Sequence, residues 1–224
     1  MDINKIKDTI IFRGMTEYEI VDALKGLNAV TKRYEKGATI LCTGSTTRRM
    51  GLIIEGSVTI ENNDIWGNRT ILGYAGKNDF FAETYGFLSH EPMLVDVVAN
   101  EDCKIVFLAI AILRSDTFKN ELWASKIVSN LLLISTQKNL ALSGRSFHLS
   151  HKTVRGRVMS YLNSESVRKA RTSFNIPFNR QQMADYLNLD RTALSKELGR
   201  MRKDGLIDFH KNHFKIKKRM EIQF

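Results

Sequence analysis

Residues 189–207, LDRTALSKELGRMRKDGLI, combine bases and hydroxyls at spacings that suit one face of a helix. Asp190 can cap the start of that helix and Gly205 can end it. Leu194 and Leu198 would turn toward a core. The outward face then carries Arg191, Thr192, Ser195, Lys196 and Gly199. Arginine and lysine can donate to guanine in a DNA major groove, and threonine and serine can contact bases. The alternative is a solvated basic face on an ordinary helical domain.

A second helix is predicted directly before it, over 179–187, NRQQMADYL. Asn179 and Gln182 occupy the positions of a capping box. The turn between the two helices is short, and the small Ala184 allows them to pack closely. This is the pattern of a helix-turn-helix, whose second helix enters the major groove.

A small basic β-hairpin is predicted at the end of the chain. Residues 207–209 and 214–216 alternate apolar and polar types about a turn at His210–His213. Beside a helix-turn-helix, such a hairpin would be a wing whose bases meet phosphate. The candidate DNA contacts are Arg180, Gln181, Arg191, Thr192, Ser195, Lys196, Arg200, Lys211 and Lys215.

The net charge of +10 is concentrated in the last third of the chain. Residues 145–224 hold 18 Lys and Arg against 7 Asp and Glu, a formal charge of +11. The first 144 residues hold 16 bases and 17 acids, a formal charge of −1. A neutral part joined to a strongly basic one predicts a division of labour, with a polyanion as the partner of the basic part.

From about residue 29 to 112, short apolar runs alternate with Gly, Asn and Asp turn signals. Many short strands at near-regular spacing predict an antiparallel sandwich or roll. A short helix precedes them over 16–27, where Thr16 and Glu19 fit a capping box.

A long helix is predicted over 116–142, with Asp116 as its cap and Gly144 at its end. One stripe follows the 3-4 spacing of a coiled-coil seam: Ala124, Ile127, Leu131, Ile134, Lys138 and Ala141. Further apolar residues lie off that stripe, so the helix is expected to pack both on the strand domain and on a twin helix. A core helix of a monomer is the alternative.

The predicted architecture is α+β. It consists of a jelly-roll-like antiparallel β-roll that senses an effector (1–115), a dimerisation helix (116–144) and a winged helix-turn-helix domain that binds DNA (145–224).

This order resembles the Crp/Fnr family of transcription regulators over nearly the full chain. The segments 34-YEKGATILCTGS-45 and 72-LGYAGKNDFFAETYGF-87 are similar to turns and strands of the family's sensor. Residues 180–207 are similar to the signature of its DNA-binding domain. The resemblance implies a homodimeric, sequence-specific regulator that binds a near-palindromic operator in double-stranded DNA and contacts RNA polymerase.

The chain departs from the family pattern on the second helix. Many members carry Arg-Glu-x-x-x-Arg there, whereas the matching residues here are Arg191, Thr192 and Lys196. The Glu that would accept from cytosine is missing, so a different operator is expected.

The sensor departs from the family's cyclic-nucleotide cassette as well. Glu83 matches the Glu that bonds ribose, but 89-SHEPMLVDV-97 lacks the Arg that holds phosphate. We therefore expect a small organic effector other than cAMP, or no effector. Its candidate contacts are Phe81, Glu83, Thr84, Tyr85, Met93 and Leu131. The alternative is that the apolar members are core residues and that Glu83 bonds loop amides.

Metal and redox chemistry fit the sequence poorly. Cys42 and Cys103 are too few for a disulfide framework, and two reduced, buried thiols are expected. His148 and His151 stand at i, i+3 without a third ligand, so no metal site is predicted. Residues 29–112 contain only one histidine, His90, which argues against a jelly-roll metalloenzyme and against haem.

Targeting segments are not predicted either. The chain has no apolar run of about 18 residues and no cleavable signal peptide, so a cytoplasmic protein without a membrane segment is expected. An enzymatic activity is not predicted. A cyclic-nucleotide-type sensor that regulates a partner protein remains the alternative to a DNA-binding regulator.

Overall fold

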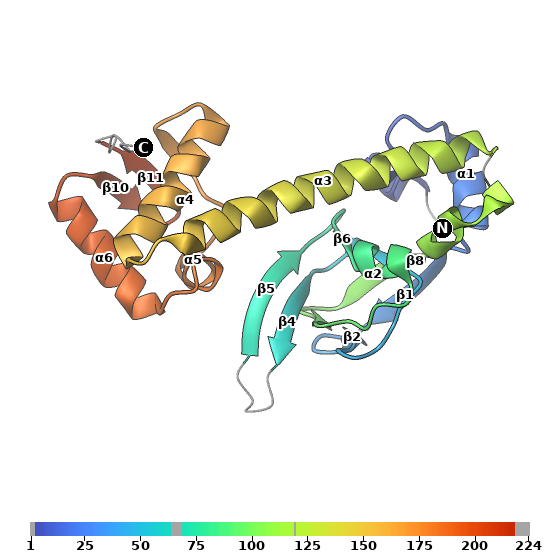
Figure 1. The fold of residues 1–224 in the computed structure, drawn as a ribbon, viewed down its shortest axis with the longest axis horizontal. Helices are drawn as coiled ribbons and strands as arrows, with labels where there is room; N and C mark the ends of the chain where they lie inside the picture. The colour runs from blue at the N-terminus through green and yellow to red at the C-terminus, as the bar shows by residue number, and fades with distance from the viewer. Residues whose placement is uncertain (1–2, 64–68, 119, 218–224) are drawn as a thin grey trace. The chain divides into compact units, whose positions relative to one another are not determined.

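The computed structural model describes residues 3–63, 69–118 and 120–217. The chain divides into two compact units, Met1–Lys138 and Asn139–Phe224. Figure 1 shows strands as the main component of the first unit and helices as that of the second.

The described strands of the first unit form two four-stranded antiparallel sheets. The order β1-β8-β3-β6 joins Val30–Tyr34, Cys103–Leu108, Met50–Glu55 and Phe80–Phe81. The order β2-β7-β4-β5 joins Thr39–Leu41, Asp96–Ala99, Val58–Asn63 and Arg69–Ala75. This arrangement confirms the predicted antiparallel β-roll.

The first of these sheets is covered on both faces. On β3, Met50 and Leu52 belong to one apolar cluster, while the next residue, Ile53, belongs to another. On β8, Val106 lies in the first cluster and Ile105 in the second. Successive side chains of a strand point to opposite faces, so a strand buried on both sides becomes a continuous apolar run.

Helices cover the face of this sheet that carries Met50. Helix α1, Glu17–Gly26, begins with the predicted capping box, in which the Thr16 side chain accepts from the Glu19 amide. Helix α2, Glu83–Leu88, follows β6 directly, and its Tyr85 packs against the cluster that contains Ile53 instead. The 3-10 helices are η1, Ile3–Lys5; η2, Ile10–Phe12; η3, Ile110–Arg114; and η4, Asp116–Phe118.

Helix α3 spans Leu122–Ser150, so both of its predicted ends are wrong. Asp116 starts the separate 3-10 turn η4 instead of α3. Gly144 lies inside the helix, where a glycine costs only about 1 kcal/mol relative to alanine. Contacts made beyond Gly144 by Arg145 and His148 hold the last turns in place.

The predicted coiled-coil stripe of α3 has another role. Ala124, Ile127, Leu131 and Ile134 pack in the same cluster as Met50, and Lys138 is bonded to Glu83. For these five residues the interpretation as the seam for a twin helix is therefore wrong, because the chain's own roll covers them. Ala141, the sixth residue of the predicted stripe, is exposed. The opposite side of α3 leaves Val128 and Leu132 exposed.

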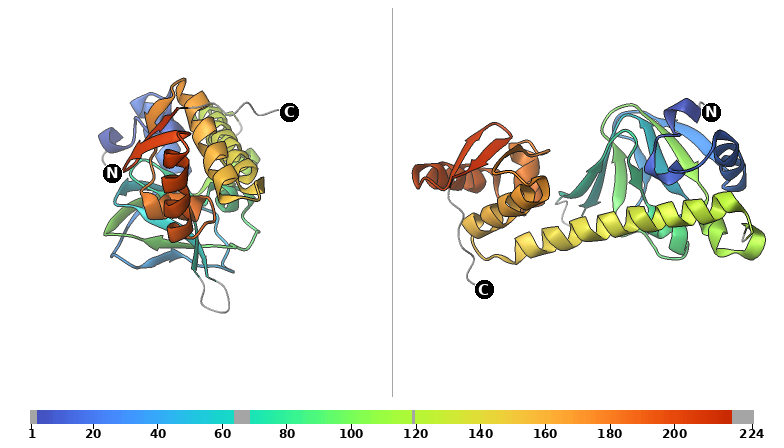
Figure 2. Two further views of the ribbon diagram at one scale, coloured as in Figure 1. Left: turned by 90° about the vertical axis from the view of Figure 1, so that its left-hand side faces the viewer. Right: turned by 90° about the horizontal axis from the view of Figure 1, so that it is seen from above.

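The second unit contains a helix-turn-helix and a three-stranded sheet around one core. Figure 2 shows its helices α4, α5 and α6 beside the strands of that sheet. The helices are α4, Val154–Lys169; α5, Arg180–Tyr186; and α6, Arg191–Lys203. The sheet order β10-β11-β9 joins Ile207–His210, His213–Ile216 and Ser173–Asn175. The hairpin β10-β11 is confirmed, whereas β9 adds a third strand that the polar stretch 164–175 did not indicate.

The two cysteines differ in exposure. Cys103 is buried as predicted, and burial raises the pKa of its thiol. Cys42 is exposed, so the prediction of two buried thiols is wrong. It lies just after β2, in a turn that reverses at Gly44 with φ of +81°, where the chain leaves the sheet.

Candidate DNA-binding surface and sensor site

Helix α6 presents a basic face to solvent. The Asp190 side chain accepts from the Ala193 amide at 2.8 Å and fixes the start of the helix, as predicted. Leu194, Leu198 and Met201 are fully buried on its inner side. The outer side exposes Arg191, Thr192, Ser195, Lys196 and Arg200.

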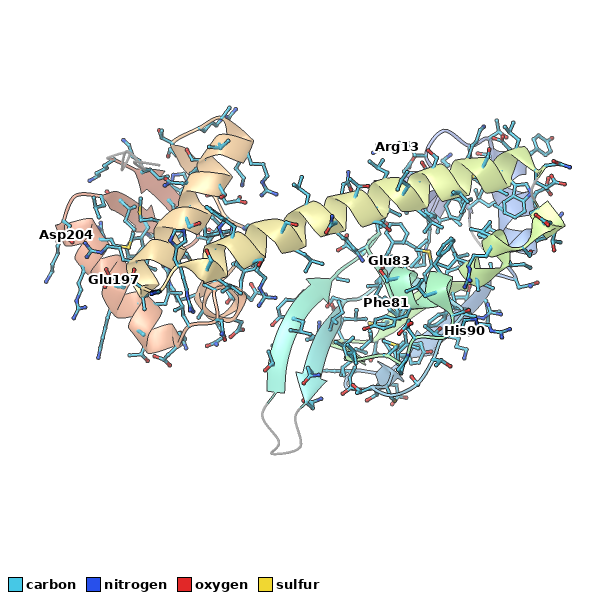
Figure 3. All side chains as sticks on the ribbon, in the orientation of Figure 1. Arg13, Phe81, Glu83, His90, Glu197 and Asp204 are labelled. Carbon is cyan, nitrogen blue, oxygen red and sulfur yellow. The ribbon has the colours of Figure 1, made fainter. Side chains whose placement is uncertain are left out.

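The acidic residue of this helix is held by ion pairs. Glu197 is the sole acidic residue between Arg191 and Lys203. Its carboxylate accepts from Arg155 of α4 at 2.6 Å, and the Glu197 side chain is only 13% exposed. Arg155 also pairs with Asp204 at 2.8 Å. Figure 3 shows Glu197 and Asp204 in the α6 region. Glu197 Oε2 also lies 3.5 Å from Nη1 of the exposed Arg200, so its carboxylate is shared between Arg155 and one base of the outer face.

The other candidate DNA contacts differ in availability. Arg180 donates to the Lys211 carbonyl and stacks over the rings of Phe209 and Phe214, and its burial lowers its pKa. It thus joins α5 to the hairpin. Gln181 is exposed and donates to Asp185 of its own helix at 2.8 Å.

On the hairpin, Lys211 and Lys215 are both exposed. Lys211 lies at the turn between β10 and β11 with φ of +52°. His213, which follows in β11, is engaged by β9 through both ring nitrogens, with Ser173 and Asn175 as partners. Of these three residues, the two lysines are therefore the ones available to a phosphate.

The roll places Glu83 next to α3. Lys138 Nζ donates to Glu83 Oε2 at 2.8 Å and to the Phe80 carbonyl at 2.9 Å. The Glu83 side chain is 10% exposed. Figure 3 shows Glu83 in α2, next to α3. The Lys138 ammonium is thus bonded to the Glu83 carboxylate, which the sequence predicted to bind an effector.

The other predicted effector contacts are not brought into one cavity. Phe81 and Met93 lie in the core between the two sheets, whereas Leu131 lies in the cluster on the other face of the β3 sheet. Thr84 is exposed, and Tyr85 accepts from the Leu94 amide at 3.3 Å. These six residues stay a prediction as an effector site.

A surface groove of about 530 Å³ lies elsewhere on the first unit. It is lined by Ile3, Val21, Leu24, Lys25, Asn28 and Ala29. None of these residues belongs to the predicted effector set.

His148 has a structural environment. It is 4% exposed, and its Nδ1 lies 2.9 Å from Ser160 Oγ. Burial lowers the pKa of His148, with a further lowering from His151 and an opposing effect of Glu165. Within the described residues there is no group of three or more His, Cys, Asp or Glu side chains arranged to hold a metal ion. Over the same residues, no helix has the length and hydropathy that a membrane crossing needs.

Three arginines and a lysine make long-range contacts that no sequence pattern indicates. Each makes at least one bond to a partner 30 or more positions away; they are Arg145, Arg155, Arg157 and Lys138. Helix periodicity and capping patterns depend only on neighbours within about four residues, so they cannot indicate such long-range pairs.

Comparison with known proteins agrees with both units. Residues 31–115 match the cyclic nucleotide-binding domain, and residues 156–223 match the Crp-like helix-turn-helix domain. The transcriptional activator protein FnrL of Cereibacter sphaeroides is 25% identical over 186 residues, which cover 79% of this chain and 71% of FnrL.

Two solved structures share the fold. FixK2 from Bradyrhizobium japonicum is 18% identical with a TM-score of 0.57, covering 85% of this chain and 93% of FixK2. The global regulator CLP of Xanthomonas campestris is 18% identical with a TM-score of 0.63, covering 91% of this chain and all of CLP. With its cyclic nucleotide-binding domain followed by a Crp-like helix-turn-helix domain, the chain belongs to the Crp/Fnr family of transcription regulators.

Proposed function

We propose that this chain is a sequence-specific DNA-binding regulator that acts as a homodimer. The observation that carries the proposal is the exposed outer face of α6, which holds bases and hydroxyls above a fully buried leucine row. Such a face can enter the major groove, where arginine and lysine donate to guanine.

The residues of this surface take different roles in the proposal. Arg191 and Lys196 contact base edges, and Thr192 and Ser195 support them. Arg200, Gln181 and the wing residues Lys211 and Lys215 contact the DNA backbone. Arg180 contributes by holding the wing against α5, because its guanidinium is stacked over the wing aromatics.

Selection from a random-sequence duplex pool with the purified full chain tests this function. We expect enrichment of one near-palindromic sequence, with half-sites about one helical turn apart. Enrichment of no sequence would contradict the proposal and favour the alternative in which the sensor regulates a partner protein.

The variant Lys196→Ala then tests the base-reading role. We expect a loss of about 1–3 kcal/mol in discrimination between the selected duplex and a scrambled one. Lys215→Ala, on the wing, is the comparison, since a phosphate contact weakens binding to both duplexes alike. Equal losses for Lys196→Ala on the two duplexes would move Lys196 to the backbone-contact group.

The dimer in this proposal uses the side of α3 that the roll leaves uncovered. Ser125, Val128, Leu132 and Ser135 are exposed and follow the 3-4 spacing of a paired helix. A twofold dimer presents two copies of α6 to two half-sites, which matches the predicted near-palindrome. RNA polymerase is the proposed protein partner on the promoter.

The proposed effector is a small molecule other than cAMP, or none. The Glu83 carboxylate is already neutralised by Lys138, and no arginine stands in 89–97 to bind a cyclic phosphate. Thermal shift measurements with cAMP, cGMP and c-di-GMP test this point; CLP is described as responsive to c-di-GMP. Stabilisation by cAMP at micromolar concentration would contradict the proposal.

A further inference from the structure

The turn of the helix-turn-helix is held by two arginines that come from outside it. Backbone amides satisfy the carbonyls of Met183, Ala184 and Asp185 near the end of α5, through the amides of Leu187, Leu189 and Asn188. The next three carbonyls are those of Tyr186, Leu187 and Asn188, and each accepts from a guanidinium.

Arg145, in the last turns of α3, supplies the first of these bonds. Its Nε donates to the Tyr186 carbonyl at 2.9 Å and its Nη2 to the Asp185 carbonyl at 3.3 Å. The same guanidinium lies over the Tyr186 ring, 5.4 Å from its centroid. A cation at this place also suits the negative end of the α5 dipole.

Arg157, in α4, supplies the others and makes a connection to α3. Its Nη1 donates to the Asn188 carbonyl at 2.9 Å and to the Leu187 carbonyl at 3.3 Å. Its Nε donates to the His151 carbonyl at 2.9 Å, one residue beyond the end of α3. One side chain therefore joins the α3–α4 junction to the turn before α6.

We propose that Arg145 and Arg157 are positioning residues for DNA recognition. They fix the turn at Asn188 to the end of α3, and α6 begins only three residues later, at Arg191. Asn188 itself has φ of +50°, a conformation that asparagine tolerates but that its neighbours must stabilise. The direction of the exposed first turn of α6 is thus set from α3 and α4 through five main-chain carbonyls. This inference rests on the proposed DNA-binding function.

The test uses Arg157→Met and Arg145→Met in the full chain, with the duplex that the wild-type chain enriches from a random pool. Hydrogen bonds to charged groups are worth enough for an affinity loss of roughly tenfold to a hundredfold on that duplex for Arg157→Met. Binding to a scrambled duplex should change by less than about threefold, and the salt dependence should keep its slope, because no phosphate contact is removed. Arg157→Lys should recover part of the loss, since an ammonium can still donate to one or two of the carbonyls.

A matched control is Arg171→Met, which removes an exposed arginine of the same unit and should leave the affinity for the selected duplex unchanged. Hydrogen exchange gives a second readout that needs no DNA. The amides of Leu189 and Ala193 should exchange faster in Arg157→Met, because the turn and the α6 cap open more often.

Variants that melt at a lower temperature but bind the selected duplex like wild type would overturn the inference, since the arginines would then serve stability alone. Equal losses on both duplexes with a smaller salt slope would also overturn it and make them phosphate contacts. A wild-type chain that enriches no duplex would remove the proposed function first, and unchanged exchange at Leu189 and Ala193 would separately remove this inference.

Discussion

Arg155 of α4 pairs with Glu197 of α6 at 2.6 Å. Loss of Arg155 leaves the Glu197 side chain, which is 13% exposed, with only the longer 3.5 Å pair to Arg200, and it also removes the Asp204 pair. Because Arg155 itself is 36% exposed, we expect Arg155→Met to cost about 1–2 kcal/mol of unfolding free energy, less than a fully buried pair would.

A double-mutant cycle in urea measures this pair. Glu197→Gln added to Arg155→Met should recover part of the loss, because the poorly solvated carboxylate that has lost its shorter ion pair is then gone. A double variant as unstable as the sum of the single variants would show that the two residues do not interact.

His148 gives the second unit a dependence on pH. Because burial lowers the pKa of His148, the folded chain holds the neutral imidazole below pH 6.5, where the unfolded chain takes up a proton. The free energy of unfolding should therefore fall as the pH drops below about 6.5, by up to about 1.4 kcal/mol per pH unit from this residue. At neutral pH and above the residue contributes no pH dependence.

The double variant His148→Leu, Ser160→Ala isolates the effect, since it removes both members of the buried hydrogen bond. Urea unfolding at pH 7 and pH 5.5 should show a smaller loss in this variant than in the wild type. The same loss in both would assign the pH dependence to other groups.

At the residue scale, the correct predictions concern contacts between residues close in sequence. The caps at Thr16, Asn179 and Asp190 were predicted correctly because each bonds an amide three residues away. The exposure of Arg191 and Lys196 followed from the burial of Leu194 and Leu198 on the same helix. The Lys138–Glu83 pair spans 55 positions and depends on how α3 crosses the roll, so no spacing rule could supply it.

At the element scale, periodicity identified the apolar faces but not what covers them. The stripe through Ile127 and Leu131 has the spacing of a coiled coil, yet it also suits a helix packed on a sheet, and the roll takes it. The strands of the roll were predicted more accurately, because their apolar runs and turns are set by neighbouring residues. Strand β9 was missed because it has three residues and only Phe174 is buried.

The exposed side of α3 gives a prediction about assembly. Leu132 is 68% exposed in one chain, and we expect Leu132→Glu to raise the dimer dissociation constant at least a hundredfold, because a charge would enter an apolar helix pair. Leu94→Glu is the matched control, since Leu94 is 67% exposed on the roll. Sedimentation of both variants measures the effect. A Leu132→Glu chain that dimerises like the control would place the dimer interface elsewhere.

At the scale of the whole molecule, charge separates the two units. The part from residue 145 onward carries +11, and the part before it carries −1. Repulsion among so many like charges destabilises the folded second unit unless a polyanion binds to it. Exposed bases lie on α6 and on the wing, where such a partner can reach them. The near-neutral roll leaves the long-range attraction for DNA to the second unit alone.

This division predicts how binding responds to salt and to single lysines. If six to ten phosphates are neutralised per dimer, affinity for DNA should fall by about 10³ to 10⁵ between 50 and 200 mM salt, because binding releases condensed counterions.

Lys215→Ala, on the wing, should reduce the steepness of log K against log salt by about 1 for each phosphate that is no longer neutralised. Lys77→Ala removes an exposed lysine from the roll and should leave the slope unchanged. Fluorescence anisotropy titrations over a series of salt concentrations measure all three chains. Equal slopes for wild type and Lys215→Ala would exclude the wing lysine from the phosphate-binding residues, and a reduced slope for Lys77→Ala would show that the roll also binds the DNA backbone.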